Sequence, residues 1–392
     1  MEKITGAEAL MRSLENEGVE TLFGYPGGAI MPVYDALYDH KGTLNHILVR
    51  HEQGAVHAAQ GFSRVSGRVG CAIVTSGPGA TNTITGIADA MIDSTPVVVI
   101  CGQVGTSLLG TDAFQEVDVV GVTSPITKWS YQIRRADDVA WAVSRAFFIA
   151  GSGRPGPVVL DFTKNAQTEL TNYKPVKVDF IRSYQPTPQL DATAIEKAAK
   201  MINQSVKPLV LAGQGIELGN ATEEFELFVE KAQLPVGCTL LGLSALPTDH
   251  PLNKGMLGMH GNLGPNVMTN QCDLLIAVGM RFDDRVTGNL STYAKQAKII
   301  HFDIDPSEIN KNVKADASII GDVKEVMTRL NKAVNKQDNS DWVKEIEALK
   351  EKYPLPVDRG ALTGPSIIDA IYEETKGDAI IPTDVGQHQM WA

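Results

Sequence analysis

Apolar runs alternate with amphipathic, helix-like segments along residues 1–165. Such alternation is typical of a parallel sheet that carries helices on both faces, a doubly wound α/β domain. Each predicted strand ends in Gly or Pro followed by a residue that can cap a helix, as a strand-to-helix turn requires. The predicted strands lie within residues 21–27, 45–51, 70–79, 97–102 and 155–163, and the predicted helices within 29–40, 52–67 and 80–93.

The same alternation returns after residue 190 and predicts a second doubly wound α/β domain. Residues 166–190 hold three prolines and many polar side chains without a sustained period, which is typical of a linker. Residues 336–362 predict a charged helix and a second linker. In residues 191–335 the predicted helices are 191–204 and 221–233, and the predicted strands are 207–215, 235–240, 273–279 and 298–305.

Residues 363–392 begin a third piece, with a predicted helix at 364–375 and a predicted strand at 378–386. A piece of about thirty residues cannot bury a core of its own, since even a ~60-residue domain is marginal. We therefore expect the chain to stop partway through a third domain. The predicted fold is α/β, with doubly wound parallel-sheet domains at 1–165 and 191–335 and the incomplete start of a third.

Composition and charge exclude several classes of protein. With 35 Lys and Arg against 46 Asp and Glu, the net charge of -11 argues against a nucleic-acid partner. No run approaches the ~18 apolar residues that cross a bilayer, and the N-terminus lacks the apolar core of a secretory signal. The four cysteines are far apart, so we expect buried free thiols and a cytoplasmic location.

Several candidate functional residues follow predicted strands in the first domain. Glu52 opens a helix at the carboxyl edge of the sheet, where ligands bind in open α/β folds, although a glutamate is also favoured there by the helix dipole. GYPGGAIM (24–31) and TSGPGATN (75–82) are glycine-rich turns that let backbone N–H groups approach a ligand. Neither matches a nucleotide-binding fingerprint, and each could be a tight structural turn.

Other candidates have equally plain structural alternatives. Phe114 and Gln115 lie in a predicted loop, where the phenylalanine either lines a site or packs beneath the loop. Lys164 follows a strand but could simply be solvated. RFDDRVTG (281–288) could be a surface ion-pair cluster, and HFDIDPSEI (301–309) places acids where ribose hydroxyls are bound. No zinc-ligand spacing or Ser-His-Asp order appears, so a hydrolase is not indicated.

Together and in this order, these segments resemble the catalytic large subunit of acetohydroxyacid synthase (acetolactate synthase), the biosynthetic, FAD-containing type of thiamin-diphosphate enzyme. The resemblance runs over the full length, and RFDDRVTGN with GTDAFQE and LGMHG points to the FAD-containing branch. It implies decarboxylation of pyruvate and transfer of the two-carbon unit to pyruvate or 2-oxobutyrate, in the synthesis of valine, leucine and isoleucine. The motifs that carry it are FGYPGGAIMPVYDAL, RHEQGAVHAAQGFSRVSGRVG, TSGPGATN, GTDAFQE, GRPGPVVLD, LGMHG, VGMRFDDRVTGN, FDIDPSEI and DVGQHQMW.

The resemblance also implies residue roles. Glu52 matches the glutamate that hydrogen-bonds the aminopyrimidine ring of thiamin diphosphate, and Arg285 matches the arginine that holds the carboxylate of the second substrate. The implied catalytic residues are Glu52, Gly28, Gln115 and Lys164. The implied substrate-binding residues are Ala29, Phe114, Gln115, Lys164, Met259, Asp284 and Arg285. The implied thiamin-diphosphate residues are Pro26, Gly27, Glu52, Thr75, Pro78, Asn82, Gln115, Val385, Gly386, Gln387 and His388.

FAD is structural in the family that the chain resembles, and it does not take up electrons in the main reaction. The implied FAD-binding residues are Arg154, Gly213, Gln214, Gly215, Thr239, Leu240, Leu257, Gly258, Met259, His260, Gly279, Met280, Arg281, Asp283, Arg285, Val286, Asp303, Ile304, Asp322 and Val323.

The chain departs from the family pattern at two places. Gly105, Thr106 and Ser107 stand where many relatives have proline and basic residues at the channel mouth. The GDG…N segment that holds Mg²⁺ on the diphosphate is absent, so we predict no metal ligand in this chain and no activity from it alone.

The resemblance further implies a homo-dimer or tetramer with shared active sites and a small regulatory subunit. The alternatives are a flavin-linked pyruvate oxidase and a non-catalytic FAD-binding or assembly fragment.

Overall fold

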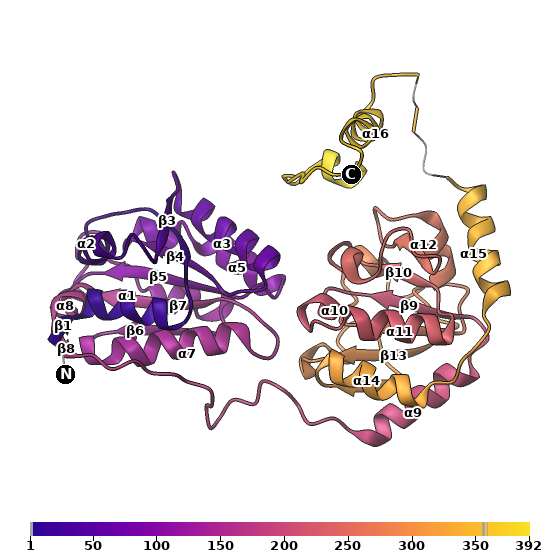
Figure 1. Cartoon of the computed structure of the whole chain (residues 1–392), viewed down its shortest axis with the longest axis horizontal. Coiled ribbons are helices and arrows are strands. Elements are labelled where there is room, and N and C mark those ends of the chain that lie inside the picture. The colour runs from indigo at the N-terminus through magenta and orange to yellow at the C-terminus, as the bar shows by residue number, and fades with distance from the viewer. Residues whose placement is uncertain (1–2, 355–356, 359) are drawn as a thin grey trace. The chain divides into compact units, whose positions relative to one another are not determined.

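The computed structural model describes residues 3–354, 357–358 and 360–392. The chain forms two compact units, Met1–Thr187 and Pro188–Ala392 (Figure 1). The division falls inside the segment 166–190 whose composition predicts a linker. Within the described ranges, no helix has the length and apolar content that crossing a bilayer requires.

The first unit contains a six-stranded sheet in the order β3-β2-β4-β5-β7-β6, and all neighbouring strands are parallel. Alternate residues of β4 point to opposite faces. Cys71 and Ile73 share a core with α1, α2 and α7, whereas Ala72 and Val74 share a core with α3 and α5. Helices therefore cover both faces, as the sequence predicts (Figure 1). The strands are β2 (Thr21–Gly24), β3 (Asn45–Leu48), β4 (Gly70–Val74), β5 (Val97–Gln103), β6 (Trp129–Ile133) and β7 (Val158–Thr163). The helices are α1 (Gly6–Asn16), α2 (Met31–Asp39), α3 (Glu52–Ser66), α4 (Pro78–Thr81), α5 (Ile84–Ile92), α6 (Val119–Thr123), α7 (Val139–Gly151) and α8 (Lys164–Thr168).

The second unit contains another six-stranded parallel sheet, in the order β11-β10-β9-β12-β13-β14. Val210 and Ala212 of β9 pack with α9, α11 and α14, whereas Leu209 and Leu211 pack with α12 and α15. This domain is therefore also doubly wound. Its strands are β9 (Pro208–Ala212), β10 (Val236–Cys238), β11 (Asn253–Met256), β12 (Leu274–Val278), β13 (Lys298–Asp303) and β14 (Ala317–Ile320). Its helices are α9 (Ala192–Gln204), α10 (Gly215–Leu218), α11 (Thr222–Ala232), α12 (Leu263–Thr269), α13 (Asp284–Thr287), α14 (Val323–Ala333) and α15 (Ser340–Lys352).

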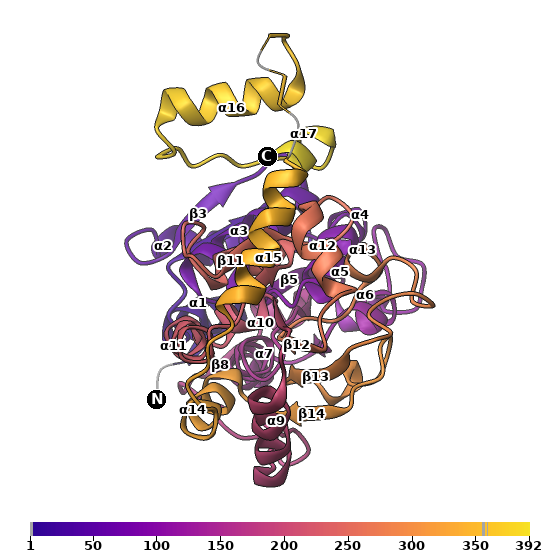
Figure 2. The ribbon, with the colours of Figure 1, turned by 90° about the vertical axis from the view of Figure 1, so that its right-hand side faces the viewer.

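The charged helix expected within 336–362 forms as α15, and it lies beside α12 (Figure 2). Its apolar stripe belongs to the core of the second unit, because Trp342 and Ile346 are buried there. The indole nitrogen of Trp342 also donates a 2.9 Å hydrogen bond to the carbonyl of Pro208 at the start of β9. The helix is therefore part of the second domain rather than a spacer.

The strand predicted at 378–386 is wrong. The helix predicted before it forms as α16 (Gly364–Thr375), but no strand follows, and a short helix, α17 (Gln387–Trp391), comes next. A strand needs a neighbour to satisfy its backbone hydrogen bonds, and no described strand lies beside this apolar run. Ile380 is accordingly 99% exposed.

Several short strands give no signal in the sequence. β6, β11 and β14 are edge strands, and residues of each are only half-buried, so their sequences lack the continuous apolar run of a central parallel strand. β1 (Lys3–Thr5) and β8 (Leu170–Asn172) form a separate antiparallel pair. All four cysteines are buried and free, as the sequence predicts.

Candidate functional site

Except for Arg154, the site residues predicted in the first unit follow five parallel strands, at the carboxyl edge of the sheet (Figure 1). The carboxyl edge is where ligands bind in open α/β sheets, at the point where the strand order reverses. Pro26, Gly27, Gly28 and Ala29 follow β2, Glu52 follows β3, Thr75, Pro78 and Asn82 follow β4, Phe114 and Gln115 follow β5, and Lys164 follows β7.

Glu52 is the first residue of α3, and its side chain turns inward, with 9% of the residue exposed. Its Oε2 accepts a 2.9 Å hydrogen bond from the side-chain amide of Asn82, which follows α4. A Cβ at Gly79 would lie 3.6 Å from Oε1, so the backbone of α4 passes close to the carboxylate. Two residues assigned to one cofactor, thirty positions apart, are therefore in direct contact.

Tyr34 of α2 is a neighbour of Glu52; it lies within the motif FGYPGGAIMPVYDAL, but no role is assigned to it from the sequence. Burial, together with the negative charge of Glu52, raises the pKa of the Tyr34 phenol well above its usual value. The hydroxyl lies 3.2 Å from Nε2 of His46 and 3.4 Å from the carbonyl of Ile73. Tyr34 thus remains a neutral hydrogen-bonding group beneath the turn that follows β2.

The turn after β2 is held against β4 by Thr75. A Cβ at Gly27 would lie 2.6 Å from Cβ of Thr75, so only glycine fits at position 27. The Thr75 hydroxyl accepts a 3.3 Å hydrogen bond from the backbone N–H of Ala29. By contrast, nothing lies within 4 Å of a Cβ built at Gly28, so this part of the turn presents open backbone.

Two side chains from α8 hold the carbonyls of the same turn. Lys164 donates to the carbonyl of Gly28 at 3.4 Å, and Nε2 of Gln167 donates to the carbonyl of Ala29 at 2.8 Å. Lys164 is exposed and can reach a ligand, whereas Gln167 is fully buried. Gln167 is not among the residues predicted from the sequence, because a lone glutamine in a short helix matches no motif.

The loop after β5 presents Phe114 to solvent, with 87% of the residue exposed. The alternative interpretation of Phe114, that it packs beneath the loop, is therefore wrong within this chain. Gln115 has a left-handed backbone, with φ of 56°, and a Cβ at Gly77 would lie 2.6 Å from the Gln115 carbonyl oxygen. The loop thus rests on the glycine-rich turn after β4, which places Gln115 next to the Thr75–Asn82 segment.

The second sheet has the strand order of the dinucleotide-binding fold. Counted from β9, its strands follow the order 3-2-1-4-5-6, and the order reverses between β9 and β12. Except for Arg154, the residues matched to FAD-binding positions all lie at the carboxyl ends of these six strands. Gly213, Gln214 and Gly215 follow β9, Thr239 and Leu240 follow β10, Leu257, Gly258, Met259 and His260 follow β11, Gly279, Met280, Arg281, Asp283, Arg285 and Val286 follow β12, Asp303 and Ile304 end β13, and Asp322 and Val323 follow β14.

Three glycines at the reversal point touch through their backbones. The N–H of Gly215 donates a 3.0 Å hydrogen bond to the carbonyl of Gly279, and a Cβ at Gly213 would lie 2.2 Å from that oxygen. Gly279 also has a φ of 58°, which side chains rarely tolerate. The N–H groups of the three glycines all donate to carbonyls of the protein, so these residues allow two turns to approach closely at the point of strand-order reversal, where dinucleotides bind in this fold. The residues present therefore fit a dinucleotide.

A short helix, α13, brings the three substrate-assigned residues of this unit together. Asp283 caps it by accepting from the N–H groups of Arg285 and Val286 at 3.0 and 3.3 Å. The N–H of Met259 donates to the Arg285 carbonyl at 2.7 Å, which ties the loop after β11 to α13. The Arg285 guanidinium lies 3.1 Å from the Asp284 carboxylate, and both side chains are exposed. The surface ion pair considered from the sequence exists, and it leaves the guanidinium accessible.

His301 of β13 is a buried support for this site. Its Nε2 lies 2.8 Å from the carbonyl of Met280, and its Nδ1 has no partner among the described residues. Burial lowers the pKa of His301, so the neutral ring donates from Nε2. The histidine thereby fixes the backbone that follows β12.

The remaining predicted residues lie apart from these groups in the sequence. Arg154 follows α7, and its Nε donates a 2.9 Å hydrogen bond to Ser94. Val385 and Gly386 precede α17, and Gln387 and His388 belong to it. Val385 is 82% exposed. Their assignment to a cofactor stays a prediction.

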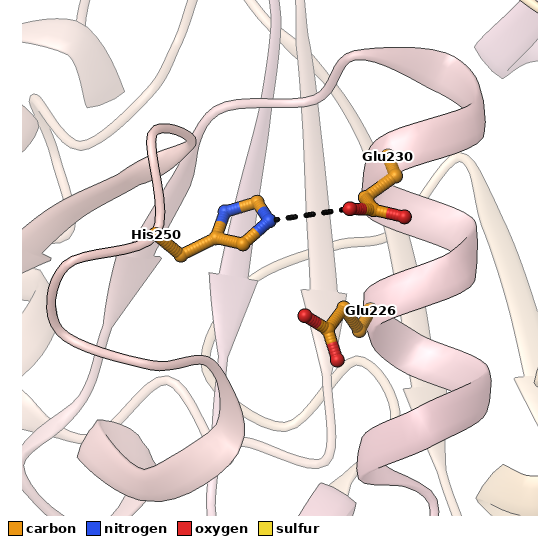
Figure 3. A group of neighbouring side chains, drawn as sticks. All are labelled: Glu226, Glu230 and His250. Carbon is orange, nitrogen blue, oxygen red and sulfur yellow. Dashed lines mark ion pairs between the residues drawn. The ribbon is translucent and has the colours of Figure 1, made fainter.

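One group of potential metal ligands exists among the described residues: Glu226 and Glu230 on α11, with His250 from the loop before β11 (Figure 3). Nε2 of His250 faces Oε1 of Glu230 at 3.7 Å. Nδ1 of His250 accepts a 3.1 Å hydrogen bond from the N–H of Leu252, so a neutral ring carries its proton on Nε2. Nε2 then has no free lone pair for a cation, so we interpret the group as a contact between His250 and Glu230 and not as a metal site.

Two family descriptions match the chain. Residues 4–122 match the thiamine pyrophosphate enzyme, N-terminal TPP binding domain, and residues 195–330 match the thiamine pyrophosphate enzyme, central domain. Thiamine pyrophosphate is another name for thiamin diphosphate.

Similar proteins include the acetolactate synthase large subunits of Parasynechococcus marenigrum, Corynebacterium glutamicum and Haemophilus influenzae, which are 47%, 46% and 44% identical to this chain. The alignments cover 99%, 100% and 100% of the chain and 64%, 64% and 70% of those proteins. The chain therefore spans about two thirds of the length of its relatives.

Proposed function

Because this chain belongs to the acetolactate synthase large-subunit family of thiamine pyrophosphate enzymes, we propose that it carries part of the machinery of that reaction. The reaction decarboxylates pyruvate and adds the two-carbon unit to a second 2-oxo acid, giving 2-acetolactate or 2-aceto-2-hydroxybutyrate. The observation that carries the proposal is the inward-facing Glu52 carboxylate, held by Asn82 beside the glycine-rich turn after β4 at the sheet edge.

Thiamin diphosphate, when bound, supplies an electron sink for the carbon that loses CO₂. The role of Glu52 is to hold a proton at a ring nitrogen of the cofactor through its carboxylate. Asn82 fixes one carboxylate oxygen at 2.9 Å and so sets the direction in which the carboxylate points. Gly28 contributes open backbone, and the turn is kept rigid by Thr75 and Gln167.

We assign the first 2-oxo acid to the space bordered by Phe114, Gln115 and Lys164. The ammonium of Lys164 supplies a positive charge for a carboxylate, and Phe114 supplies an apolar surface for the alkyl group. Arg285, with Met259 and Asp284 beside it, binds the carboxylate of the second 2-oxo acid, since a guanidinium grips a carboxylate with two parallel hydrogen bonds.

The second unit, in this proposal, binds FAD as a structural group. The strand order and the contact among Gly213, Gly215 and Gly279 support this assignment. The same geometry would serve a flavin-linked pyruvate oxidase, in which FAD accepts electrons. Pyruvate added without another reductant would bleach the flavin of an oxidase and leave that of a synthase oxidised.

The wider assignments also belong to this proposal. They are Mg²⁺ on the diphosphate, a dimer or tetramer with shared active sites, a small regulatory subunit, and a place in branched-chain amino-acid synthesis. We assign the Mg²⁺ no ligand in this chain. A cytoplasmic location is consistent with four free, buried thiols.

The test compares this 392-residue chain with a protein of the length of its relatives that contains it. Each is incubated with pyruvate, thiamin diphosphate, Mg²⁺ and FAD, and acetolactate is measured. We expect product from the longer protein and none from this chain. A longer protein that folds and binds thiamin diphosphate but makes no acetolactate would contradict the proposed function, and product from this chain alone would contradict our expectation that it lacks the metal site.

A further inference from the structure

Gln103, the last residue of β5, has a fully buried side chain that makes three hydrogen bonds. Its Nε2 donates to the carbonyl of Val117 at 2.9 Å and to Oδ2 of Asp161 at 3.2 Å. Its Oε1 accepts from the N–H of Val104 at 2.9 Å. A buried amide satisfied on both sides has a defined position, because each bond that it gave up would leave a buried polar group unpaired.

These bonds join the two ends of one loop. Val104 is where the chain leaves β5, and Val117 is where it returns toward α6, so one side chain ties the start of residues 104–117 to their end. The loop carries Phe114 and Gln115, both exposed. The position of these two side chains thus depends on a closure made beneath them, at the sheet.

Asp161 of β7 decides which way the Gln103 amide faces. The Asp161 carboxylate is fully buried, and its Oδ2 accepts from both Gln103 and Gln132, the latter at 2.7 Å. A carboxylate oxygen repels an amide oxygen, so Nε2 must face Asp161 and Oε1 must face Val104. With the amide reversed, its oxygen would face both Asp161 and the Val117 carbonyl, and the loop would lose its closure.

The charged and titratable groups around Asp161 come from each neighbouring element. They are Asp118 at the start of α6, Cys101 of β5 and Arg134 after β6. Burial raises the pKa of Asp161 to about 6, against the hydrogen bonds from Gln132 and Gln103, which lower it. Oδ1 has no partner among the described residues. Either protonation state leaves Oδ2 able to accept from Gln103, so the closure does not require one particular charge.

We propose that Gln103, oriented by Asp161, is a positioning residue that fixes the loop of Phe114 and Gln115 and thereby the selectivity for the 2-oxo acid that enters beside it. The selectivity rests on the proposed function, whereas the closure of the loop does not. A loop that moves by an ångström changes how an alkyl group fits against Phe114, and one methylene in an apolar pocket is worth about 10–200-fold in discrimination.

The chain offers a matched pair of variants. Gln103→Met keeps the volume but removes the bonds to Val104, Val117 and Asp161. Gln132→Met removes an equivalent bond to the same Asp161 oxygen without touching the loop. Asp161→Asn is a conservative variant, because its amide oxygen still accepts from Gln103.

The first measurement is hydrogen exchange on this chain at the N–H groups of Gly110, Ala113 and Glu116, each hydrogen-bonded inside the loop. We expect exchange at least tenfold faster in Gln103→Met, and near wild-type exchange in Gln132→Met and Asp161→Asn. Equal exchange in Gln103→Met and the wild type would overturn the closure. Equal acceleration in Gln132→Met would also overturn it, since general loosening of the domain would then explain the effect.

The second measurement is the ratio of CO₂ released from pyruvate to CO₂ released from 2-oxobutyrate, each supplied alone to a protein of the length of the relatives. Gln103→Met should change the ratio severalfold, and Gln132→Met, which also removes a buried hydrogen bond to Asp161, should leave it as in the wild type. An unchanged ratio in Gln103→Met with accelerated exchange would overturn the role in selectivity. Absence of CO₂ release by the wild type would instead count against the proposed function, and the exchange result would still stand.

Discussion

The side-chain amide of Asn82 donates a 2.9 Å hydrogen bond to Oε2 of Glu52, across thirty residues of sequence. Glu52 is the first residue of α3, and Asn82 directly follows α4. Both helices begin at the carboxyl edge of the same sheet. A glutamate that merely favours a helix start needs no such partner. The contact instead holds an inward-facing carboxylate in a fixed direction, which is the arrangement that acid–base chemistry requires.

Glu52→Gln, in a protein of the length of the relatives, should lower turnover by roughly 10²–10⁴-fold. Glutamine preserves the shape and can still accept from Asn82, but its amide cannot take up a proton at the cofactor. The measurement is the rate of acetolactate formation beside the melting temperature. Near-normal turnover would show that Glu52 serves only the start of α3.

Arg285→Lys should weaken use of the second 2-oxo acid more than release of CO₂ from the first. Lysine keeps the charge but loses the planar fork, and losing one charge-assisted hydrogen bond costs roughly 1.5–3 kcal/mol, or about ten- to a hundredfold. The comparison is CO₂ release against acetolactate yield, with the ratio of the two acceptors. Equal losses in both steps with an unmoved ratio would assign Arg285 to structure or to FAD.

Gly279→Ala should destabilise the second unit by more than its backbone conformation alone explains. Gly279 and Gly288 have nearly the same φ, 58° and 56°, but a Cβ at Gly279 would lie 2.6 Å from the Gly215 Cα, whereas Gly288 has open space. Left-handed strain costs roughly 1–3 kcal/mol in each. The unfolding free energy of both variants is measured by urea denaturation. A larger loss in Gly279→Ala than in Gly288→Ala is then due to the contact with Gly215.

The same pair of variants tests the flavin assignment. Gly279→Ala should weaken quenching of FAD fluorescence by the chain, whereas Gly288→Ala should leave it close to that of the wild type. Equal quenching by both variants would mean that the reversal point of the second sheet does not receive the dinucleotide.

His40 should make the first unit less stable as pH rises above neutrality. Burial opposes its charge, but hydrogen bonds with Glu15 at 2.8 Å and Glu8 at 3.1 Å outweigh this and raise its pKa. A raised folded-state pKa gives a contribution that is fully present below the unfolded pKa, about 6.5, and is lost as pH rises through the folded value.

The measurement for His40 is the difference in unfolding free energy between the wild type and His40→Asn, followed from pH 5.5 to 9. Taking the difference removes other titrating groups, such as Lys128, whose pKa burial lowers to about 8. We expect the advantage of the wild type to shrink across this range. An advantage that is constant with pH would show that the charge of His40 contributes nothing.

The sequence predicted the central strands and the edge strand β3, but it missed the other three edge strands of the two six-stranded sheets. β4, β5, β9 and β12 are buried on both faces, so each is a nearly continuous apolar run. The edge strands β6, β11 and β14 lack such runs. Conversely, residues 378–386 have the composition of a strand but form none, because no described strand lies beside them to pair with.

By itself, the sequence determined the fold class, the two domains and the candidate site residues, because periodicity and family motifs are local properties of the chain. The tertiary structure decided which side chains support those motifs. Gln103 and Gln167 match no motif, and Asp161 ends the motif GRPGPVVLD without a role assigned to it, since a buried amide or carboxylate gains its role from partners on other segments. The structure also decided that Phe114 is exposed. The physical reason is common to these cases: burial and hydrogen-bond partners are set by contacts between segments far apart in sequence, which local pattern cannot encode.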